Sequence, residues 1–238
     1  MNLDTDLNPY RCAVYFVPEV HSDWWQAGSR WLGRCAASGT TYPPPVIDGV
    51  EATAFQACTA DPRRYGWHAT LKAPFRLAAG RSLLTVQSAL RDLAHRLPAF
   101  DMPPLHITRM GSFLALVPQG DLSQIQATAA ACVMELHPLA QALGEDDLAR
   151  RRKAPLTPEQ DRLLLAWGYP WVLDEFRFHM SLTGPLNELP PEAQDAVQAA
   201  ATEHFKGLPT CRFGQLALFV EPQAGADFEL VDTMALSA

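Results

Sequence analysis

Two stretches of the chain alternate between apolar and polar residues in a way that predicts half-buried strands. The apolar positions of the first stretch, 67–76, are Trp67, Ala69, Leu71, Ala73 and Phe75. Those of the second stretch, 171–183, are Phe176, Phe178, Met180 and Leu182. Because the side chains of a strand point alternately to its two faces, the polar residues in between are expected to share the opposite face.

The rest of the pattern adds helices and further strands, and together they predict an α+β fold. Apolar residues at helical spacing predict helices over 22–39, 82–97, 122–136, 158–168 and 191–205. Runs rich in β-formers predict strands over 11–17, 105–110, 113–117, 212–220 and 228–231, of which the second and third form a hairpin. The segment 40–62 contains Pro43-Pro44-Pro45 and little periodicity, so it is expected to be a loop with some local order.

Composition restricts the choice of partners. The 238 residues include 48% hydrophobic and 19% charged residues, as in an ordinary globular protein of one large domain or two closely packed lobes. The net charge of −7 argues against a surface that binds long nucleic acid, whereas a small anionic ligand needs only a few local cations. The run Arg150 to Lys153 is interpreted as a solvated helix face rather than an RNA-binding patch.

The sequence also gives expectations about the compartment. Five widely spaced cysteines without a C-x-x-C pair predict reduced thiols in a cytoplasmic protein, with neither a disulfide framework nor a zinc site. Residues 1–9 contain two aspartates and no apolar run, so no secretory signal is expected there. No stretch has the length and apolarity of a membrane span.

The polar faces of the two alternating stretches carry the same chemistry. His68 is followed two residues later by Thr70, and His179 is followed two residues later by Ser181. An aromatic residue precedes each histidine, and a proline follows six positions after it. On a strand, residues i and i+2 lie on one face about 6.5 to 7 Å apart. Each histidine and its hydroxyl can therefore converge on one ligand group.

Two imidazoles and two hydroxyls across a cleft would suit a phosphodiester. Histidine titrates near neutral pH, so one copy can remove a proton from the attacking oxygen and the other can protonate the departing one. The hydroxyls of Thr70 and Ser181 would donate to the non-bridging oxygens. This design requires no metal, and ligation of a metal by the two histidines alone would leave an incomplete set.

Neighbouring polar residues extend these faces. Lys72 and Arg177 have the same parity as the histidines and are expected to offset the charge of the substrate, although pairing of Arg177 with Glu175 is an alternative. Thr183 continues the second face, where it either binds substrate or is only a strand-end hydroxyl. Tyr15, on the first strand, either stacks on a base or ribose or packs in the core.

A third match to the pattern, at His106 and Thr108, lacks the proline six residues after the histidine. The hydroxyl is also followed by Arg109, which has the opposite parity. We interpret His106 as a chance match and assign it no role.

The tetrapeptides His68-Ala69-Thr70-Leu71 and His179-Met180-Ser181-Leu182 resemble the double signature of the two-histidine (2H) phosphoesterase superfamily, which includes cyclic phosphodiesterases and 2′-5′ RNA ligases. The longer sequence segments 61–75, 111–116 and 175–179 are similar to those of a branch of uncharacterised proteins encoded in phosphonate-utilisation operons. The resemblance extends from Tyr10 to about Leu186. It implies a single bilobal domain over 1–238, with a central cleft to which each lobe contributes one histidine strand.

The same resemblance implies an activity. We expect a cofactor-free, metal-independent phosphodiesterase that opens a small cyclic phosphodiester, ribosyl or nucleotide-like, with a place in phosphonate metabolism. His68 and His179 would act as acid and base in an order that the sequence leaves open. One alternative is a 2′,3′-cyclic phosphodiesterase or 2′-5′ ligase for RNA ends, and another is a nucleotide- or phosphate-binding protein without catalysis.

Overall fold

The α+β architecture expected from the sequence is confirmed. The structure, a computed structural model, describes residues 8–238, so most of the segment considered for a secretory signal lies outside it. Its main sheet has seven strands in the order β4-β5-β6-β2-β1-β8-β9, and every pairing is antiparallel. The bounds are β1 Arg11–Phe16, β2 Ala69–Phe75, β4 Leu105–Met110, β5 Phe113–Pro118, β6 Met180–Ser181, β8 Gln215–Glu221 and β9 Glu229–Ala235. Strands β3, Phe100–Asp101, and β7, Arg212–Phe213, form a separate pair.

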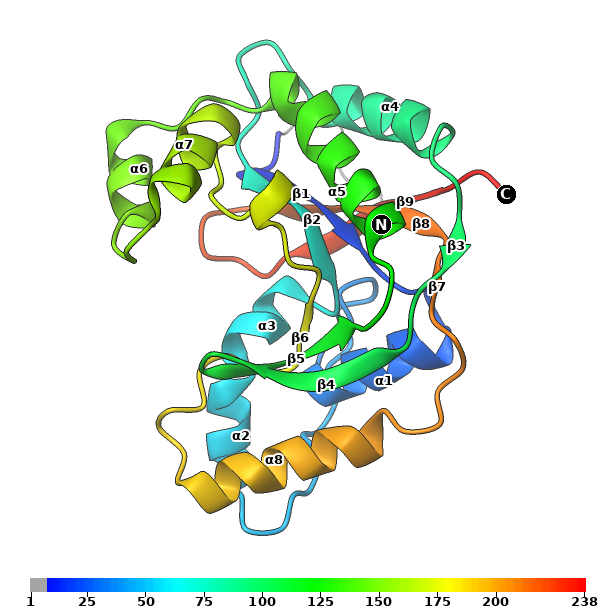
Figure 1. The fold of residues 1–238 in the computed structure, drawn as a ribbon, viewed down its shortest axis with the longest axis vertical. Helices are drawn as coiled ribbons and strands as arrows, with labels where there is room; N and C mark the ends of the chain where they lie inside the picture. Colours follow the sequence, from blue (N-terminus) through cyan, green and yellow to red (C-terminus); the bar gives the residue numbers. More distant parts are fainter. Residues whose placement is uncertain (1–7) are drawn as a thin grey trace.

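The helices form two groups, one on each side of the middle of the molecule (Figure 1). One group contains α4 Leu83–Ala94, α5 Ser123–Leu136, α6 Glu145–Arg151 and α7 Pro158–Trp167. The other contains α1 Asp23–Leu32, α2 Ala52–Cys58, α3 Ala60–Tyr65 and α8 Pro191–His204. Short 3-10 turns follow α5, at His137–Leu139, and precede β6, at Leu173–Glu175. No helix in the range 8–238 is long and apolar enough to cross a membrane.

Helix boundaries follow local capping chemistry. Ser22 caps α1 by accepting the N–H of Trp25, and Ser82 and Thr157 open α4 and α7 with capping boxes. The first predicted helix ends earlier than expected, because Gly33 adopts a left-handed conformation at φ 82° and terminates α1 there. The chain then reverses in a turn that contains Gly39, and Arg34 pairs with Thr41 across it.

The prediction of a loop over 40–62 is wrong in its second half, where α2 and the start of α3 lie. Helix α2 buries only Phe55 and Cys58, so it lacks the long apolar stripe by which helices are recognised in sequence. Pro62 lies in the first turn of α3, where its missing N–H costs no hydrogen bond.

The long strand predicted over 171–183 is also wrong. Only Met180–Ser181 pair as a strand, after a 3-10 turn and an unpaired extended stretch. The alternating burial itself is real, because Phe176, Phe178, Met180 and Leu182 are all buried. The alternation thus correctly predicted which side chains face the core. A strand also needs hydrogen bonds to the backbone of a neighbouring strand, which the alternation does not predict.

Candidate active site

The two histidine motifs lie on adjacent strands at the centre of the sheet. Strand β2 pairs with β6 through Ala69 and Met180, and this pair joins the two halves of the sheet. One step along each strand, His68 lies across from Ser181, and Thr70 lies across from His179. Residues next to a pair point to the opposite face from the pair itself, so all four polar side chains share one face. The structure therefore brings the predicted quartet together.

His68 is held in one orientation by its own chain. Helix α3 ends at Gly66, whose φ of 81° is readily adopted only by glycine, and the next residues turn into β2. The Nδ1 of His68 lies 2.9 Å from the carbonyl oxygen of Gly66, and its Nε2 lies 3.2 Å from the Oγ1 of Thr70. An N–H at Nδ1 donates to the carbonyl, which leaves Nε2 as an acceptor for the hydroxyl of Thr70.

His179 repeats this local geometry. Its Nδ1 lies 2.8 Å from the carbonyl oxygen of Arg177, two residues earlier in the chain. This hydrogen bond likewise leaves Nε2 as the free ring nitrogen. The ring of Phe113, on β5, lies beside it at 5.7 Å between centroids. The two motifs thus use equivalent hydrogen bonds although their flanking secondary structure differs.

A cleft of about 380 Å³ opens over this face of the sheet. Its lining includes His68, Thr70, Ser181 and Thr183, and Tyr15 lies beneath. The ring of Tyr15 stacks on His68 at 3.8 Å between centroids and has no exposed surface. Of the two roles weighed for Tyr15, the structure places it in the core, as a support for the imidazole.

Lys72 does not face this cleft, contrary to the prediction from parity. On β1, Tyr15 pairs with Thr70 but Val14 pairs with Lys72, so β2 contains an extra residue between these pairs. Such a β-bulge reverses the faces of the residues that follow it, up to a second irregularity between Lys72 and Phe75. Lys72 is consequently 4% exposed and points toward α5, where its Nζ lies 3.4 Å from the carbonyl oxygen of Val133.

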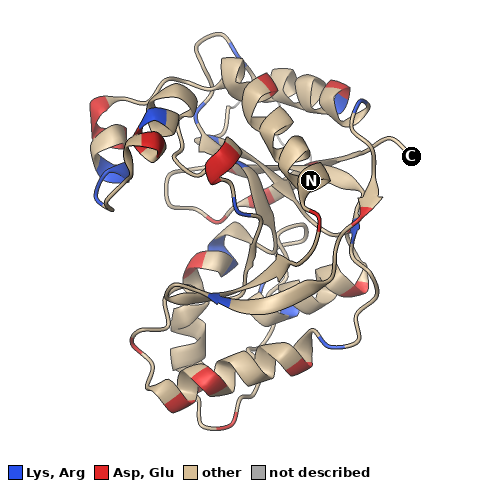
Figure 2. Ribbon diagram, viewed as in Figure 1, with Lys and Arg blue, Asp and Glu red and all other residues tan. Residues whose placement is uncertain are grey.

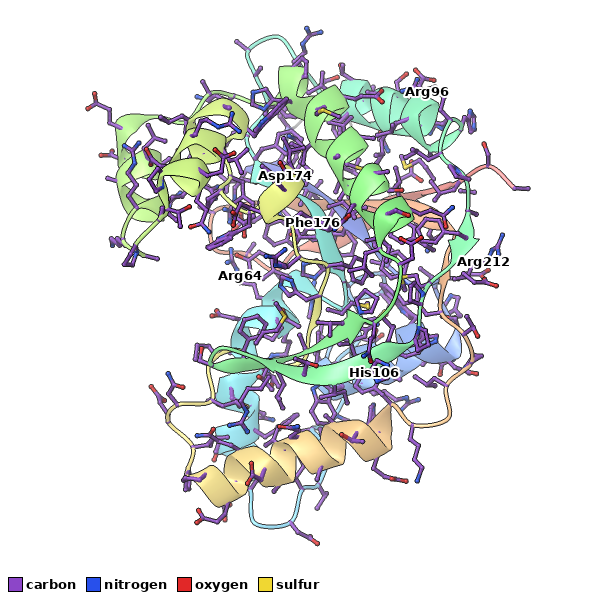
Figure 3. All side chains as sticks on the ribbon, in the orientation of Figure 1. Arg64, Arg96, His106, Asp174, Phe176 and Arg212 are labelled. Atoms are coloured by element: carbon purple, nitrogen blue, oxygen red, sulfur yellow. The ribbon has the colours of Figure 1, made fainter. Side chains whose placement is uncertain are left out.

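Three other residues singled out in the sequence have different environments. Arg177 has an exposed side chain that is not among those lining the cleft in residues 8–238, and only its carbonyl oxygen contacts His179. Thr183 is 1% exposed and accepts the N–H of Leu114 at its Oγ1, which makes it a strand-end hydroxyl as well as a lining residue. His106 is exposed on the edge strand β4 (Figure 3).

The cleft contains arginines that sequence reasoning missed. Arg11 lies at its edge and binds Glu221 through Nε. Arg151, on α6, also lines it, with its guanidinium 5.4 Å from the centroid of the Tyr169 ring. Figure 2 shows basic segments on α6 and on α3. The only sequence signal was the run Arg150 to Lys153, in which Arg150 and Arg152 bind Asp147 and Asp161.

The pKa of His68 is lowered from 6.5 to about 4, mainly by burial and to a smaller extent by the charge of nearby His179. In the unfolded chain the imidazole regains its ordinary pKa. The stability of the fold is then independent of this group above pH 6.5 and decreases as the pH falls toward 4, because the unfolded state binds the proton first. The full difference corresponds to about 3 kcal/mol.

We therefore expect that His68→Gln will lose less stability than the wild type when the pH is lowered from 7 to 4.5. Urea unfolding at both pH values measures this, since the carboxylates common to both proteins contribute equally to each. His106→Gln, exposed on β4, serves as the matched control and should follow the wild type. Equal losses in the wild type and His68→Gln would contradict burial of a neutral imidazole.

Comparison with known proteins adds a family and two curated relatives. Residues 70–229 match the family described as "Protein of unknown function (DUF1045)". The "Ribose 1,5-bisphosphate phosphokinase PhnN" of Janthinobacterium sp. (strain Marseille) is 39% identical over 195 residues, which are 82% of this chain and 43% of that protein. The protein of the same name from Laribacter hongkongensis (strain HLHK9) is 39% identical over 220 residues, 92% and 50% of the two chains. This chain thus spans about half the length of the curated relatives it matches.

Solved structures with a similar fold have low sequence identity. The crystal structure of E. coli LigT complexed with NADP+ is 13% identical with a TM-score of 0.44, covering 97% of this chain and 99% of that one. A structure described as a phosphoesterase is 11% identical with a TM-score of 0.42, covering 97% and 100%. At these values we base no conclusion about activity on them.

Proposed function

Since this chain belongs to the DUF1045 family of proteins of unknown function, we propose its activity from the site itself: metal-independent hydrolysis of a small cyclic phosphodiester. The observation that carries the proposal is the quartet of two imidazoles and two hydroxyls on one face of β2 and β6. His68, Thr70 and Ser181 line the cleft, and His179 lies beside them on the same face without being one of the lining residues. It offers a proton acceptor, a proton donor and neutral donors for phosphate oxygens, which are the groups that this reaction needs.

The environment of the two rings differs and favours one assignment of roles. Burial keeps His68 neutral at pH 7, with a free lone pair at Nε2 once the hydroxyl of Thr70 turns to the phosphate. His68 Nε2 would accept the proton of the attacking water as the new P–O bond forms. His179, in its imidazolium form, would give a proton to the departing sugar oxygen as the ring P–O bond breaks. The bound phosphate anion would raise the pKa of His68 and so strengthen the base.

The substrate is proposed to be small, as a ribosyl or nucleotide-like ester. The cleft of about 380 Å³ lies near the lower end of the volumes of about 300 to 1,000 Å³ that hold small ligands. A place in phosphonate metabolism and in the cytoplasm stays part of this proposal. We do not extend it to the kinase activity in the relatives' names, because none of the 238 residues forms a G-x-x-x-x-G-K-S/T phosphate loop.

The test is a panel of cyclic phosphodiesters assayed with EDTA present and read by phosphorus NMR. The panel contains ribose and nucleoside cyclic phosphates and short RNAs that end in a 2′,3′-cyclic phosphate. We expect a ring-opened monoester from a small member. Turnover of the RNAs alone would support the RNA-end alternative, and binding without product at every pH tested would support a non-catalytic phosphate-binding protein.

A further inference from the structure

A second cavity adjoins the cleft behind β2. Its volume is about 180 Å³, and it lies between β2, the end of α5 and α7. The two cavities have four lining residues in common: Ala73, Pro74, Arg151 and Tyr169. A ligand seated in the cleft therefore lies next to this cavity, which is smaller than the roughly 300 Å³ expected of a complete small-molecule site.

Three nitrogen donors with unmet hydrogen-bonding capacity line this cavity. The ammonium of Lys72 carries three protons but makes one long hydrogen bond, to the carbonyl oxygen of Val133, and otherwise lies over the ring of Phe75 at 5.1 Å. The Nδ1 of His137 and the Nε of Arg151 are buried without a hydrogen-bond partner. Buried donors are normally satisfied, so three in one cavity indicate a missing acceptor.

The charge of the lining agrees with an anionic acceptor. Among the described residues that surround the cavity there is no aspartate or glutamate. The guanidinium of Arg151 has no carboxylate partner in residues 8–238, whereas both of its arginine neighbours have one. A buried ammonium without a counter-ion is costly, and burial lowers the pKa of Lys72 to about 8. A bound anion would restore the ordinary charge balance.

We propose that this cavity binds a phosphoryl group, held by Lys72, His137 and Arg151, as the second anionic group of the substrate. The assignment to substrate rests on the proposed function, because it places the reacting diester in the adjoining cleft. The substrate class is then a sugar cyclic phosphodiester that carries a phosphomonoester. The reaction that supplies it must form an intramolecular phosphodiester on an already phosphorylated sugar.

The substrate class is tested by comparing ribose 2,3-cyclic phosphate with its 5-phosphorylated form. In the wild type we expect kcat/KM to be at least about tenfold higher for the phosphorylated ester, since hydrogen bonds to a charged group are stronger than neutral ones. Lys72→Met and Arg151→Met should reduce this ratio toward one. Arg152→Met is the matched control, because Arg152 binds Asp161 on the surface and should keep the ratio of the wild type.

The inference is overturned if the ratio of the two kcat/KM values is near one in the wild type, or if it is unchanged in both Lys72→Met and Arg151→Met. In either case, hydrolysis of the esters still supports the proposed function. If neither ester is hydrolysed, the proposed function fails and the cavity is judged by calorimetric titration of the same four proteins with inorganic phosphate. Binding that is at least tenfold weaker in Lys72→Met and Arg151→Met supports an anion site. Equal binding in all four proteins, or none, overturns it. Circular dichroism confirms that each variant is folded.

Discussion

His68→Asn and His179→Asn are each expected to reduce kcat/KM for a cyclic phosphodiester by about 10² to 10⁴. Each variant removes one proton-transfer group, while the hydroxyls of Thr70 and Ser181 still hold the phosphate. The double variant should be little worse than the poorer single variant, because acid and base act in one concerted step. Rates are measured with a ring-opening assay under subsaturating substrate.

The third histidine match provides the control for this experiment. His106→Asn changes the same residue type in the same sequence pattern, but on the exposed edge strand β4. It should retain the rate of the wild type. Undiminished turnover in His68→Asn or His179→Asn would refute the acid–base assignment. A loss of turnover in His106→Asn would mean that replacing a histidine far from the cleft also lowers activity, so the losses in the other two variants could not be assigned to the site.

Glu221→Ala is expected to lower the free energy of unfolding by about 3 to 5 kcal/mol. The side chain of Glu221 is fully buried and binds both Arg11 and Arg64, and its Oε1 also accepts the N–H of Gly225 at 2.8 Å. Removal of this carboxylate leaves two partly buried guanidinium groups without their counter-ion. Arg11 also lines the cleft, so the variant should also lose activity.

Urea unfolding measures this change, with Asp101→Ala as the comparison. Asp101 pairs with Arg212, but both side chains are largely exposed, at 66% and 58%. Exposed pairs contribute about 0 to 1 kcal/mol, so Asp101→Ala should change stability little. A similar small change for Glu221→Ala would mean that its two arginines are solvated in the folded protein.

The sequence predicted the placement of the quartet on one face better than the placement of the residues around it. His68, Thr70, His179 and Ser181 were found because each motif is local and needs only two residues of extended chain. Lys72 was misplaced because parity counting assumes an unbroken strand, and a bulge depends on how a neighbouring strand pairs. The sequence of a single chain does not show directly how β2 pairs with the neighbouring strand.

Arg151 was missed for a related reason. Within a run of four basic residues, sequence does not show which side chain finds a carboxylate and which turns inward. Its neighbours Arg150 and Arg152 bind acids three and nine residues away, and these contacts leave Arg151 over the cleft. The selection arises from tertiary contacts, because Arg152 binds Asp161 on α7 and Arg151 lies over the ring of Tyr169.

Each imidazole takes its orientation from a carbonyl only two residues away, at Gly66 and at Arg177. The tautomer of each ring is therefore encoded within a three-residue segment of main chain rather than by a distant side chain. Substitutions elsewhere can vary the walls and depth of the cleft without altering ring polarity. Such a site can diversify its ligands over evolutionary time while the proton-transfer pair stays constant, provided that β2 and β6 remain neighbours.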